Sequence, residues 1–279
     1  MSEAPQRSLL DAIDRALEED LGSGDLTSAA VVPEGALAQA RIEQRAPGVL
    51  AGLRVAQAVF GRVDPLLRWQ ALAPEGEWLE PAPVAEITGA AAAIMAGERV
   101  ALNFLGRLSG VATLTARYVS AVEGTGAVIL DTRKTTPGLR ALEKEAVRLG
   151  GGTNHRQGLF DAILVKENHS LLAGGVGKAT CLALEHAPEG VAVEVECATL
   201  GEVEEALGAG AGRLLLDNME PTELRRAVEL AGGRAELEAS GGIDLETVRE
   251  VAETGVDYIS VGALTHSAPA LDVSLLLTQ

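Results

Sequence analysis

Four short hydrophobic runs decide the fold of this chain: VAVEVE at residues 191–196, RLLLD at 213–217, AELEA at 235–239 and DYISV at 257–261. Each run begins 22 residues after the previous one. A constant internal period indicates a repeated structural unit, here one strand, one helix and their connections. Apolar residues at helical spacing lie between the runs, at 200–207, 221–230 and 245–254.

Two similar runs extend the pattern toward the N-terminus, at residues 127–131 and 162–166. Strands that alternate with helices form parallel sheets, which close into a barrel or open into a doubly wound sheet. No GxGxxG motif follows a predicted strand, which disfavours the dinucleotide-binding form of the open sheet. We therefore expect an α/β fold built on an incomplete parallel α/β barrel of about six strands.

The residues before about 125 follow a different pattern. Their periodicity predicts helices at 8–19, 53–63 and 98–122, and strands at 38–44, 67–72 and 77–88. Such a mixture is typical of an α+β open sandwich. We therefore expect an N-terminal α+β sandwich domain over residues 1–112, joined by the C-terminal tail 268–279, and a barrel domain over residues 113–267.

The composition is that of a globular protein. Of the 279 residues, 47% are hydrophobic and 23% charged, and no apolar run approaches the ~20 residues of a membrane-spanning helix. The formal charge of −17 argues against nucleic acid or an anionic membrane as a partner, because both would be repelled. The first residues lack a secretion-signal pattern, so we expect a cytoplasmic protein with Cys181 and Cys197 reduced and buried.

One segment departs from the acidic average. Between Asp131 and Lys178 there are eight basic residues against five acidic ones, whereas the rest of the chain carries a net charge of −20. An exposed helix face over 140–148 accounts for three of the basic residues. It does not account for Arg133, Lys134, Arg156 and Lys166.

Polar residues stand where the predicted strands end. The clearest are Lys134, Lys166, Glu196, Asp217 and Ser240. Because the carboxyl ends of parallel strands share one edge of a barrel, where the active sites of such barrels lie, we expect these residues to converge. The chain has only four lysines against 19 arginines, and two of the four stand at strand ends. The use of lysine instead of arginine at these two strand ends indicates a site that needs a compact ammonium group.

Glycines follow the last two strands, in Ser240-Gly241-Gly242 and at Gly262. Phosphate sites in α/β barrels commonly lie in these loops, because glycine lets backbone amides approach an oxyanion closely. Glu196 and Asp217 on the same rim can bind sugar hydroxyls or Mg²⁺. We leave Glu194 out of the site residues, because we expect it to point to the opposite face of its strand from Glu196. The rim therefore predicts a phosphorylated, activated sugar beside a polyanionic co-substrate.

Three longer motifs carry a family resemblance: DTRKTTPGLR at residues 131–140, GGTNHR at 151–156 and LVKENH at 164–169. They closely resemble motifs of quinolinate phosphoribosyltransferase, the nicotinate-nucleotide pyrophosphorylase (carboxylating) of NAD biosynthesis. The resemblance extends over nearly the whole chain, through Glu196, LLDNM at 215–219, EASGG at 238–242 and Gly262, and back to GERVALN at 97–103.

The resemblance implies a type II phosphoribosyltransferase, with an N-terminal open sandwich and an incomplete α/β barrel. It implies that phosphoribosyl passes from phosphoribosyl pyrophosphate (PRPP) to quinolinate with decarboxylation, giving nicotinate mononucleotide, pyrophosphate and CO₂. It also implies Mg²⁺ bound with PRPP, and a homodimer or higher oligomer in which Arg99 reaches the site of the neighbouring subunit.

The resemblance assigns roles to individual residues. The implied quinolinate ligands are Arg99, Arg133, His155, Arg156 and Lys166. The implied PRPP-binding residues are Thr132, Lys134, Glu196, Asp217, Ser240, Gly241, Gly242, Val261, Gly262, Ala263 and His266. The expected catalytic residues are Lys134, Lys166, Glu196 and Asp217, the last two also being expected Mg²⁺ ligands.

Two other functions are compatible with the residues themselves. A Schiff-base lyase of the aldolase type would use Lys166, which ends a barrel strand beside anion sites. The additional cationic and imidazole groups around that lysine exceed what such a lyase needs. The second alternative is a protein that binds a phosphorylated metabolite without turning it over.

Overall fold

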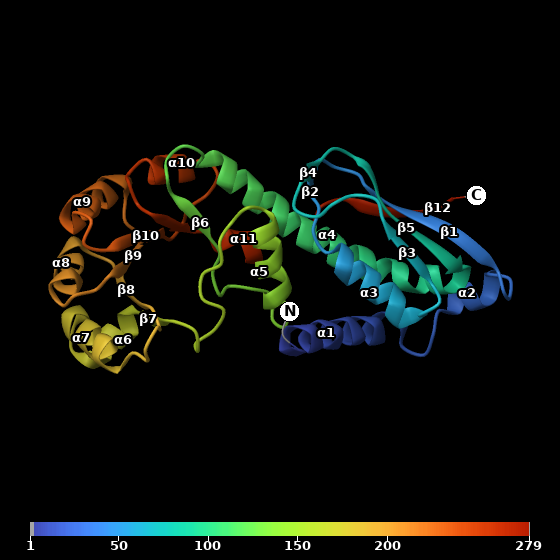
Figure 1. Ribbon diagram of the computed structural model, residues 1–279, viewed down its shortest axis with the longest axis horizontal. Helices are drawn as coiled ribbons and strands as arrows, with labels where there is room; N and C mark the ends of the chain where they lie inside the picture. Colours follow the sequence, from blue (N-terminus) through green and yellow to red (C-terminus); the bar gives the residue numbers. More distant parts are fainter. Residues whose placement is uncertain (1–2, 279) are drawn as a thin grey trace. The chain divides into compact units, whose positions relative to one another are not determined.

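The computed structural model describes the backbone of residues 3–278 and the side chains of residues 9–278. Met1, Ser2 and Gln279, which belong to the expected N-terminal domain and its tail, lie outside the described residues. The chain divides into two compact units, each assembled from segments far apart in the sequence (Figure 1). Unit 1 comprises the chain up to Ala116, Thr135–Gly151 and the segment from Ser267 onward; unit 2 comprises Arg117–Lys134 and Gly152–His266.

Unit 2 is built on a six-stranded sheet. Its strands are β6 (Val128–Leu130), β7 (Ile163–Val165), β8 (Val193–Cys197), β9 (Arg213–Asp217), β10 (Glu236–Ser240) and β11 (Tyr258–Ser260). They lie in the order β6-β11-β10-β9-β8-β7, and each neighbouring pair is parallel. The edge strands β6 and β7 do not pair with each other. The expected incomplete α/β barrel of six strands is therefore confirmed.

Helices follow the strands as the internal period predicts. Those wholly within unit 2 are α6 (Glu167–Ala173), α7 (Val176–His186), α8 (Leu200–Gly208), α9 (Pro221–Ala231), α10 (Val248–Ala252) and α11 (Ala263–His266). Pro221 opens α9, where its missing N–H costs no helical hydrogen bond. α10 is shorter than the expected helix over 245–254, because Asp244 first bonds the N–H groups of Glu246 and Thr247 in a separate turn.

The strands of unit 2 are buried on both faces. On β9, residues 214–216 are all leucine and at most 5% exposed, as expected for a parallel strand covered by helices. Glu194 on β8 and Glu238 on β10 are equally buried. Barrel interiors are normally filled by branched hydrophobic side chains. The buried carboxylates therefore mark the interior below the rim as a polar region that the fold alone does not require.

Unit 1 contains antiparallel strands and helices. Its strands are β1 (Leu37–Gln44), β2 (Gly48–Val49), β3 (Arg68–Ala71), β4 (Trp78–Leu79), β5 (Ala82–Ala90) and β12 (Val273–Thr278). Four of them form a sheet in the order β12-β1-β5-β3, while β2 pairs with β4. Its helices are α1 (Glu3–Leu21), α2 (Leu26–Val31), α3 (Leu53–Val63) and α5 (Arg140–Leu149), and α4 (Ala91–Ala121) begins in it. The tail strand β12 pairs with β1 throughout its length.

The two units differ from the expected domains in two places. Residues 135–151 group with unit 1 instead of the barrel, and the boundary inside α4 follows Ala116 instead of residue 112. The cause lies in contacts between α5 and α4. The buried carboxylate of Glu143 accepts a hydrogen bond from Arg107 at 2.7 Å. At the end of α5, Gly150 lies so close to the backbone of Ala112 that a Cβ would not fit.

Several elements of unit 1 have other limits than the sequence pattern predicts, including α1, which runs from Glu3 to Leu21 instead of over 8–19. α4 begins at Ala91, before the expected Glu98, because the preceding alanines are strong helix formers. A Cβ at Gly97 would lie 2.8 Å from the ring of Phe60 on α3, so glycine permits close packing there. The strand expected at 77–88 is divided into β4 and β5, and Pro81, which has no N–H to donate, stands between them.

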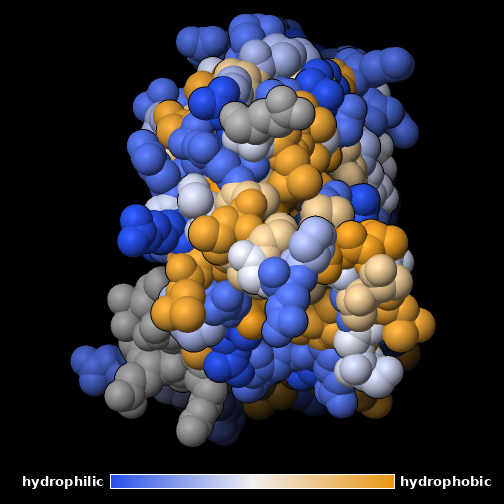
Figure 2. All heavy atoms as spheres, turned by 90° about the vertical axis from the view of Figure 1, so that its right-hand side faces the viewer, coloured by the Kyte–Doolittle hydropathy of each residue, from blue (hydrophilic) through white to orange (hydrophobic). Residues whose placement is uncertain are grey.

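Large hydrophobic side chains are exposed on both units. On unit 1, Leu26, Leu37 and Leu66 are each at least 80% exposed, and on unit 2, Phe160 and Leu172 are 84% and 87% exposed. Figure 2 shows hydrophobic side chains gathered on one face of the molecule, bordered by hydrophilic ones. Contiguous exposed apolar surface of this kind is typical of interaction sites.

No helix within residues 3–278 has the length and apolarity that crossing a membrane would require. Cys197 is buried, as expected, and its burial raises the pKa of its thiol to about 12. Cys181 lies on α7 and is exposed, so the expectation that both cysteines are buried was wrong for it.

Candidate active site

The sequence-predicted site residues of unit 2 stand at the carboxyl edge of the six strands. Thr132–Lys134 follow β6, Lys166 follows β7, Glu196 lies on β8, Asp217 ends β9, Ser240 ends β10, and Val261–Ala263 follow β11. In the parallel ladders, Ser240 pairs with both Asp217 and Ser260. The strand ends therefore lie side by side, as the barrel prediction requires.

A cavity of about 180 Å³ opens among these strand ends. Its lining residues are Thr132, Arg133, Lys134, His155, Arg156, Leu164, Lys166, Glu196, Leu215, Asp217, Glu238, Ser240 and Ser260. The four basic residues that the expected helix face did not explain all line it. That face is not exposed throughout, because Lys144 is buried. The structure thus brings together cationic and acidic groups that are up to 105 residues apart in the sequence, from Arg133 to Glu238, within one small volume.

The DTRK and TNHR motifs are joined by a buried carboxylate. Asp131 is fully buried, and its two oxygens accept hydrogen bonds from the backbone N–H of His155 at 2.9 Å and from Nδ2 of Asn154 at 2.6 Å. Thr153 also bridges to Leu130, so this segment runs beside the open edge of β6. The arrangement places Arg133 and Arg156 at the same cavity.

The two arginines of the cavity repel each other. Burial lowers the pKa of Arg156, and the positive charge of Arg133 lowers it further. Arg156 is held by a hydrogen bond from Nη1 to the carbonyl of Ala162 at 3.1 Å. Arginine stays charged under such shifts, so a bound anion that contacts both guanidinium groups would relieve the repulsion. The cavity is accordingly suited to a ligand with more than one carboxylate.

Acidic groups line the side of the cavity formed by β8 and β9. Glu196 accepts a hydrogen bond from Nζ of Lys166 at 2.8 Å. A hydrogen bond to Glu196 and its negative charge raise the pKa of Glu167, and Asp217 adds to this effect. These carboxylates supply the hard oxygen ligands that Mg²⁺ prefers, and Mg²⁺ usually takes one or two of them together with substrate phosphates. Glu196 and Asp217 therefore fit the Mg²⁺ that the resemblance implies.

The glycine loop after β10 has a conformation that other residues would resist. Gly241 has φ +103°, and a Cβ there would collide with the side chain of Asn218. Asn218 itself has φ +54°, donates its backbone N–H to Ser240 at 2.8 Å and donates Nδ2 to Asp217 at 2.8 Å. Asn218, which we did not predict as a site residue, thus links the acidic side of the cavity to the glycine loop.

Lys134 is fixed through its backbone. Its N–H donates to Oγ1 of Thr132 at 3.0 Å, and its carbonyl accepts a hydrogen bond from Oγ1 of Thr265 at 2.8 Å. A Cβ added at Gly262 would lie 3.1 Å from Nε2 of His266 and 3.3 Å from Cδ of Lys134. Lys134, His266 and the loop after β11 are therefore neighbours.

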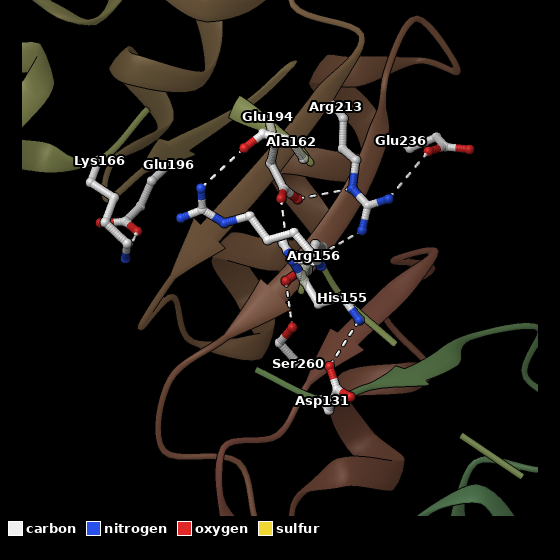
Figure 3. Close-up of polar contacts among 11 residues, drawn as sticks. Asp131, His155, Arg156, Ala162, Lys166, Glu194, Glu196, Arg213, Glu236 and Ser260 are labelled. Atoms are coloured by element: carbon white, nitrogen blue, oxygen red, sulfur yellow. Dashed lines mark hydrogen bonds and ion pairs between the residues drawn. The ribbon is translucent and has the colours of Figure 1, made fainter. Parts of the chain in front are cut away.

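A polar network that the sequence pattern did not predict reaches the cavity through His155, Glu238 and Ser260 (Figure 3). Arg213 on β9 donates to Glu194 on β8 at 2.9 Å and to Glu238 on β10 at 2.7 Å, and Ser260 on β11 donates to Glu238. Glu194 also faces His155. Glu194 lies on the same face of β8 as Glu196, because residues two apart on a strand share a face, so the expectation that it points to the opposite face was wrong. That spacing was the signal that could have found it.

The charges of this network are balanced within the protein. Burial and the nearby charge of Glu194 raise the pKa of Glu238 to about 6. Burial also disfavours the ionised form of Glu194, but the hydrogen bond from His155 and the charge of Arg213 outweigh it and lower its pKa. His155, Glu194 and Glu238 bring their ligand atoms within 4.8 Å of one another, as a metal site would. Arg213 already supplies the positive charge between the two carboxylates, so we do not assign a metal there.

Arg99 is the one predicted quinolinate ligand that belongs to unit 1. It lies on α4, its side chain is 64% exposed, and its Nη2 is 3.7 Å from a carboxylate oxygen of Glu98. It does not line the cavity of unit 2. Its expected role therefore rests on the resemblance and on its exposure.

Charged groups that converge at the carboxyl edge of a parallel barrel, with glycine loops after its last two strands, define a class: the α/β-barrel enzymes with a phosphate-binding rim. Comparison with known proteins gives the family. The model of the quinolinate phosphoribosyl transferase C-terminal domain matches residues 111–276, and the model of the N-terminal domain matches residues 25–109. The chain belongs to the quinolinate phosphoribosyltransferase family, as its motifs predicted.

Individual relatives support the same assignment. Quinolinate phosphoribosyltransferase (decarboxylating) 2b, mitochondrial, of Nicotiana tabacum is 42% identical over 97% of this chain and 82% of its own length. The probable nicotinate-nucleotide pyrophosphorylase (carboxylating) of Bacillus subtilis is 42% identical over 93% of this chain and 90% of its own. The crystal structure of NadC from Streptococcus pyogenes superposes with a TM-score of 0.92 at 43% identity, covering 96% of this chain and 95% of that one.

Proposed function

We propose that this chain transfers the phosphoribosyl group of PRPP to quinolinate and decarboxylates the product, giving nicotinate mononucleotide, pyrophosphate and CO₂ for NAD biosynthesis. One observation carries the proposal. A single cavity at the barrel rim is lined by Arg133, Lys134, Arg156 and Lys166 and lies beside the strand ends that lead into both glycine loops. That combination suits a dicarboxylate held next to a sugar phosphate.

Quinolinate carries two adjacent carboxylates on a pyridine ring. Arg133, Arg156 and Lys166 are the groups that bind them. The mutual repulsion of the two guanidinium groups favours a dianion between them, because each carboxylate can accept paired hydrogen bonds from an arginine. Lys166, tied to Glu196, contributes a point charge at the boundary between the carboxylates and the ribose.

PRPP binds along the remaining rim. The backbone amides of Ser240–Gly242 and Val261–Ala263 hold its 5′-phosphate, with His266 next to the second loop. In the first loop, Gly241 and Gly242 have positive φ, a conformation that turns N–H groups toward an anion. Glu196 and Asp217 bind the ribose hydroxyls. Lys134, with Thr132 supporting its backbone, binds the pyrophosphate.

The transfer breaks the bond between the anomeric carbon and the pyrophosphate oxygen and forms a bond from that carbon to the pyridine nitrogen. Negative charge grows on the departing oxygen, where the ammonium group of Lys134 stabilises it. Positive charge grows on the ribose ring, next to Glu196 and Asp217. Holding both substrates in line contributes further through orientation.

Loss of CO₂ then breaks the bond between C2 of the ring and its carboxylate. The electron pair stays on C2, where the neighbouring positively charged nitrogen stabilises it until a proton is taken up. The chain therefore needs no strong base for this step. The protein binds the carboxylate that remains at C3 and excludes water from the carboxylate that leaves.

We also propose Mg²⁺ as the metal that accompanies PRPP. Glu196 and Asp217 would hold it. When bound, Mg²⁺ would neutralise charge on the pyrophosphate oxygens. The carboxylate crowding that raises the pKa of Glu167 supports a cation at this side of the cavity.

We further propose that the working form is at least a homodimer in which Arg99 of one subunit serves the site of the other. The exposure of Arg99 and its place outside unit 2 support this proposal. The exposed leucines of unit 1 and Phe160 of unit 2 offer apolar surface for an interface.

We place the enzyme in the cytoplasm. The described residues include two free cysteines, Cys181 and Cys197, and no pairing between them, as is usual in a reducing compartment. Cell fractionation should recover the protein with cytoplasmic markers, and recovery from an oxidising compartment would contradict this location.

The reaction is tested with quinolinate labelled in its C2 carboxylate. With PRPP and Mg²⁺, the purified protein should release one labelled CO₂ for each nicotinate mononucleotide formed, and neither product should appear without PRPP. A Schiff-base lyase would instead form a borohydride-trapped substrate adduct on Lys166. Binding of PRPP without any release of CO₂ would leave a non-catalytic binding protein and would overturn the proposal.

A further inference from the structure

The imidazole of His155 is engaged by the protein at both nitrogens. Nδ1 accepts the backbone N–H of Arg156 at 2.7 Å, and Nε2 faces Oε2 of Glu194 at 2.9 Å and Oε2 of Glu238 at 3.5 Å. A nitrogen that accepts an N–H carries no proton, so the ring proton is on Nε2 and is donated to Glu194. The ring is 12% exposed.

We infer that His155 is a positioning residue rather than a direct quinolinate ligand, and that the network of Glu194, Arg213 and Glu238 acts through it to hold Arg156 in place. This inference rests on the proposed function, because Arg156 matters only if the cavity binds quinolinate. It changes the role that the family resemblance implies for His155.

The chain of contacts runs from the barrel floor to the rim. Arg213 is held between Glu194 and Glu238, with its guanidinium 4.3 Å from the centre of the Tyr258 ring, so it is fixed from three sides. It fixes Glu194 in turn, and Glu194 selects the Nε2–H form of His155. Only that form leaves Nδ1 free to accept the N–H of Arg156, which fixes the backbone from which the Arg156 side chain extends.

The substitution Glu194→Gln breaks this selection while preserving size. A glutamine has one oxygen and one NH₂ in place of two oxygens. If the oxygen stays with Arg213, the NH₂ group faces the Nε2–H of His155, and donor opposes donor. If the ring moves its proton to Nδ1 instead, that proton opposes the N–H of Arg156. If the oxygen turns to His155 instead, the NH₂ group opposes Arg213, which then no longer fixes the side chain. Each of these arrangements loosens Arg156.

Glu236→Gln is the matched control. Glu236 also faces Arg213, with an oxygen 3.9 Å from Nη1, but it is 56% exposed and does not line the cavity. The substitution removes a carboxylate that faces Arg213 and leaves the contacts of His155 unchanged. A general effect of weakening Arg213 would therefore appear in both variants, whereas a positioning effect would appear only in Glu194→Gln.

The experiment measures KM for each substrate, kcat, and the Kd of quinolinate alone by calorimetry. We expect Glu194→Gln to raise the KM and Kd for quinolinate about tenfold, the scale of one hydrogen bond to a charged group. The KM for PRPP should change less than about twofold and kcat less than about threefold, and Glu236→Gln should match the parent. A merely destabilised protein would instead lose kcat, with both KM values unchanged.

A double variant separates positioning from direct contact. If His155 acts only through Arg156, His155→Ala combined with Glu194→Gln should weaken quinolinate binding no more than His155→Ala does, because both remove the same support. Additive losses, or a Glu194→Gln variant that behaves like Glu236→Gln, would overturn the inference. If Glu194→Gln does not fold, Arg213→Lys takes its place and should show the same changes in KM and Kd. This substitution keeps the charge of Arg213 but not both of its hydrogen bonds.

Failure of the proposed function is distinguishable from failure of this inference. If the parent protein neither binds quinolinate nor converts it with PRPP, the proposed function fails. If the parent converts quinolinate and Glu194→Gln retains the parent's KM, the function stands and only the positioning role fails.

Discussion

Replacing Lys134 by methionine should lower kcat by about 100- to 1,000-fold, the cost of removing one preorganised group from the charge that develops in a transition state. In the proposed reaction the ammonium group of Lys134 stabilises the departing pyrophosphate, and the Lys134 backbone is fixed by Thr132 and Thr265. Methionine keeps most of the length of the side chain and removes its ammonium group. The Kd of quinolinate should therefore change little. The rate of pyrophosphate release at saturating concentrations of both substrates measures this change in kcat.

Lys178→Met is the control for this substitution. Lys178 lies on α7 and does not line the cavity, so the same loss of charge there should leave kcat at the parent value. A Lys134→Met enzyme that retains more than about a tenth of the parent kcat would contradict the role given to Lys134. Loss of a group that stabilises the departing charge should lower kcat by more than about tenfold.

Mixing two inactive variants should restore activity. In a dimer whose sites each combine Lys166 of one subunit with Arg99 of the other, Arg99→Ala and Lys166→Ala should each be nearly inactive. A hybrid of the two has one site carrying both changes and one intact site. Random exchange makes about half of the dimers hybrid, so about a quarter of the parent activity should return.

Subunit exchange must be verified for this experiment, for example by native mass spectrometry of differently tagged subunits. Each variant exchanged with itself should stay inactive. If hybrids are present and activity does not return, Arg99 acts within its own subunit or has no part in the site. Full activity of the Arg99→Ala dimer on its own would also show that Arg99 has no part in the site.

Much of the barrel was predictable because its units repeat. The 22-residue period placed four strands, and β9 was predicted at its observed limits, Arg213–Asp217. Contacts between distant segments were not predictable in this way. The grouping of α5 with unit 1 depends on Glu143 meeting Arg107 and on Gly150 meeting α4, and no local periodicity carries that information.

The rim of the site was predictable for a different reason. Parallel strands bring their carboxyl ends to one edge, so a polar residue at a strand end, such as Asp217, is placed by topology alone. Residues inside the strands are not marked in this way. Glu194 and Glu238 each look like an ordinary charge in an alternating strand, and Arg213 looks like one at the start of a leucine run. Only the three-dimensional structure of the incomplete barrel shows that they meet.

The central claim is that the cationic residues of the cavity grip two adjacent carboxylates beside an activated ribose. The most direct test compares quinolinate with nicotinate, which lacks the C2 carboxylate, as acceptors of phosphoribosyl from PRPP. Because a site built for a charged group rejects an analogue that leaves it unpaired, kcat/KM for quinolinate should exceed that for nicotinate by at least about 100-fold. Equal use of the two acceptors, or a preference for nicotinate, would contradict it.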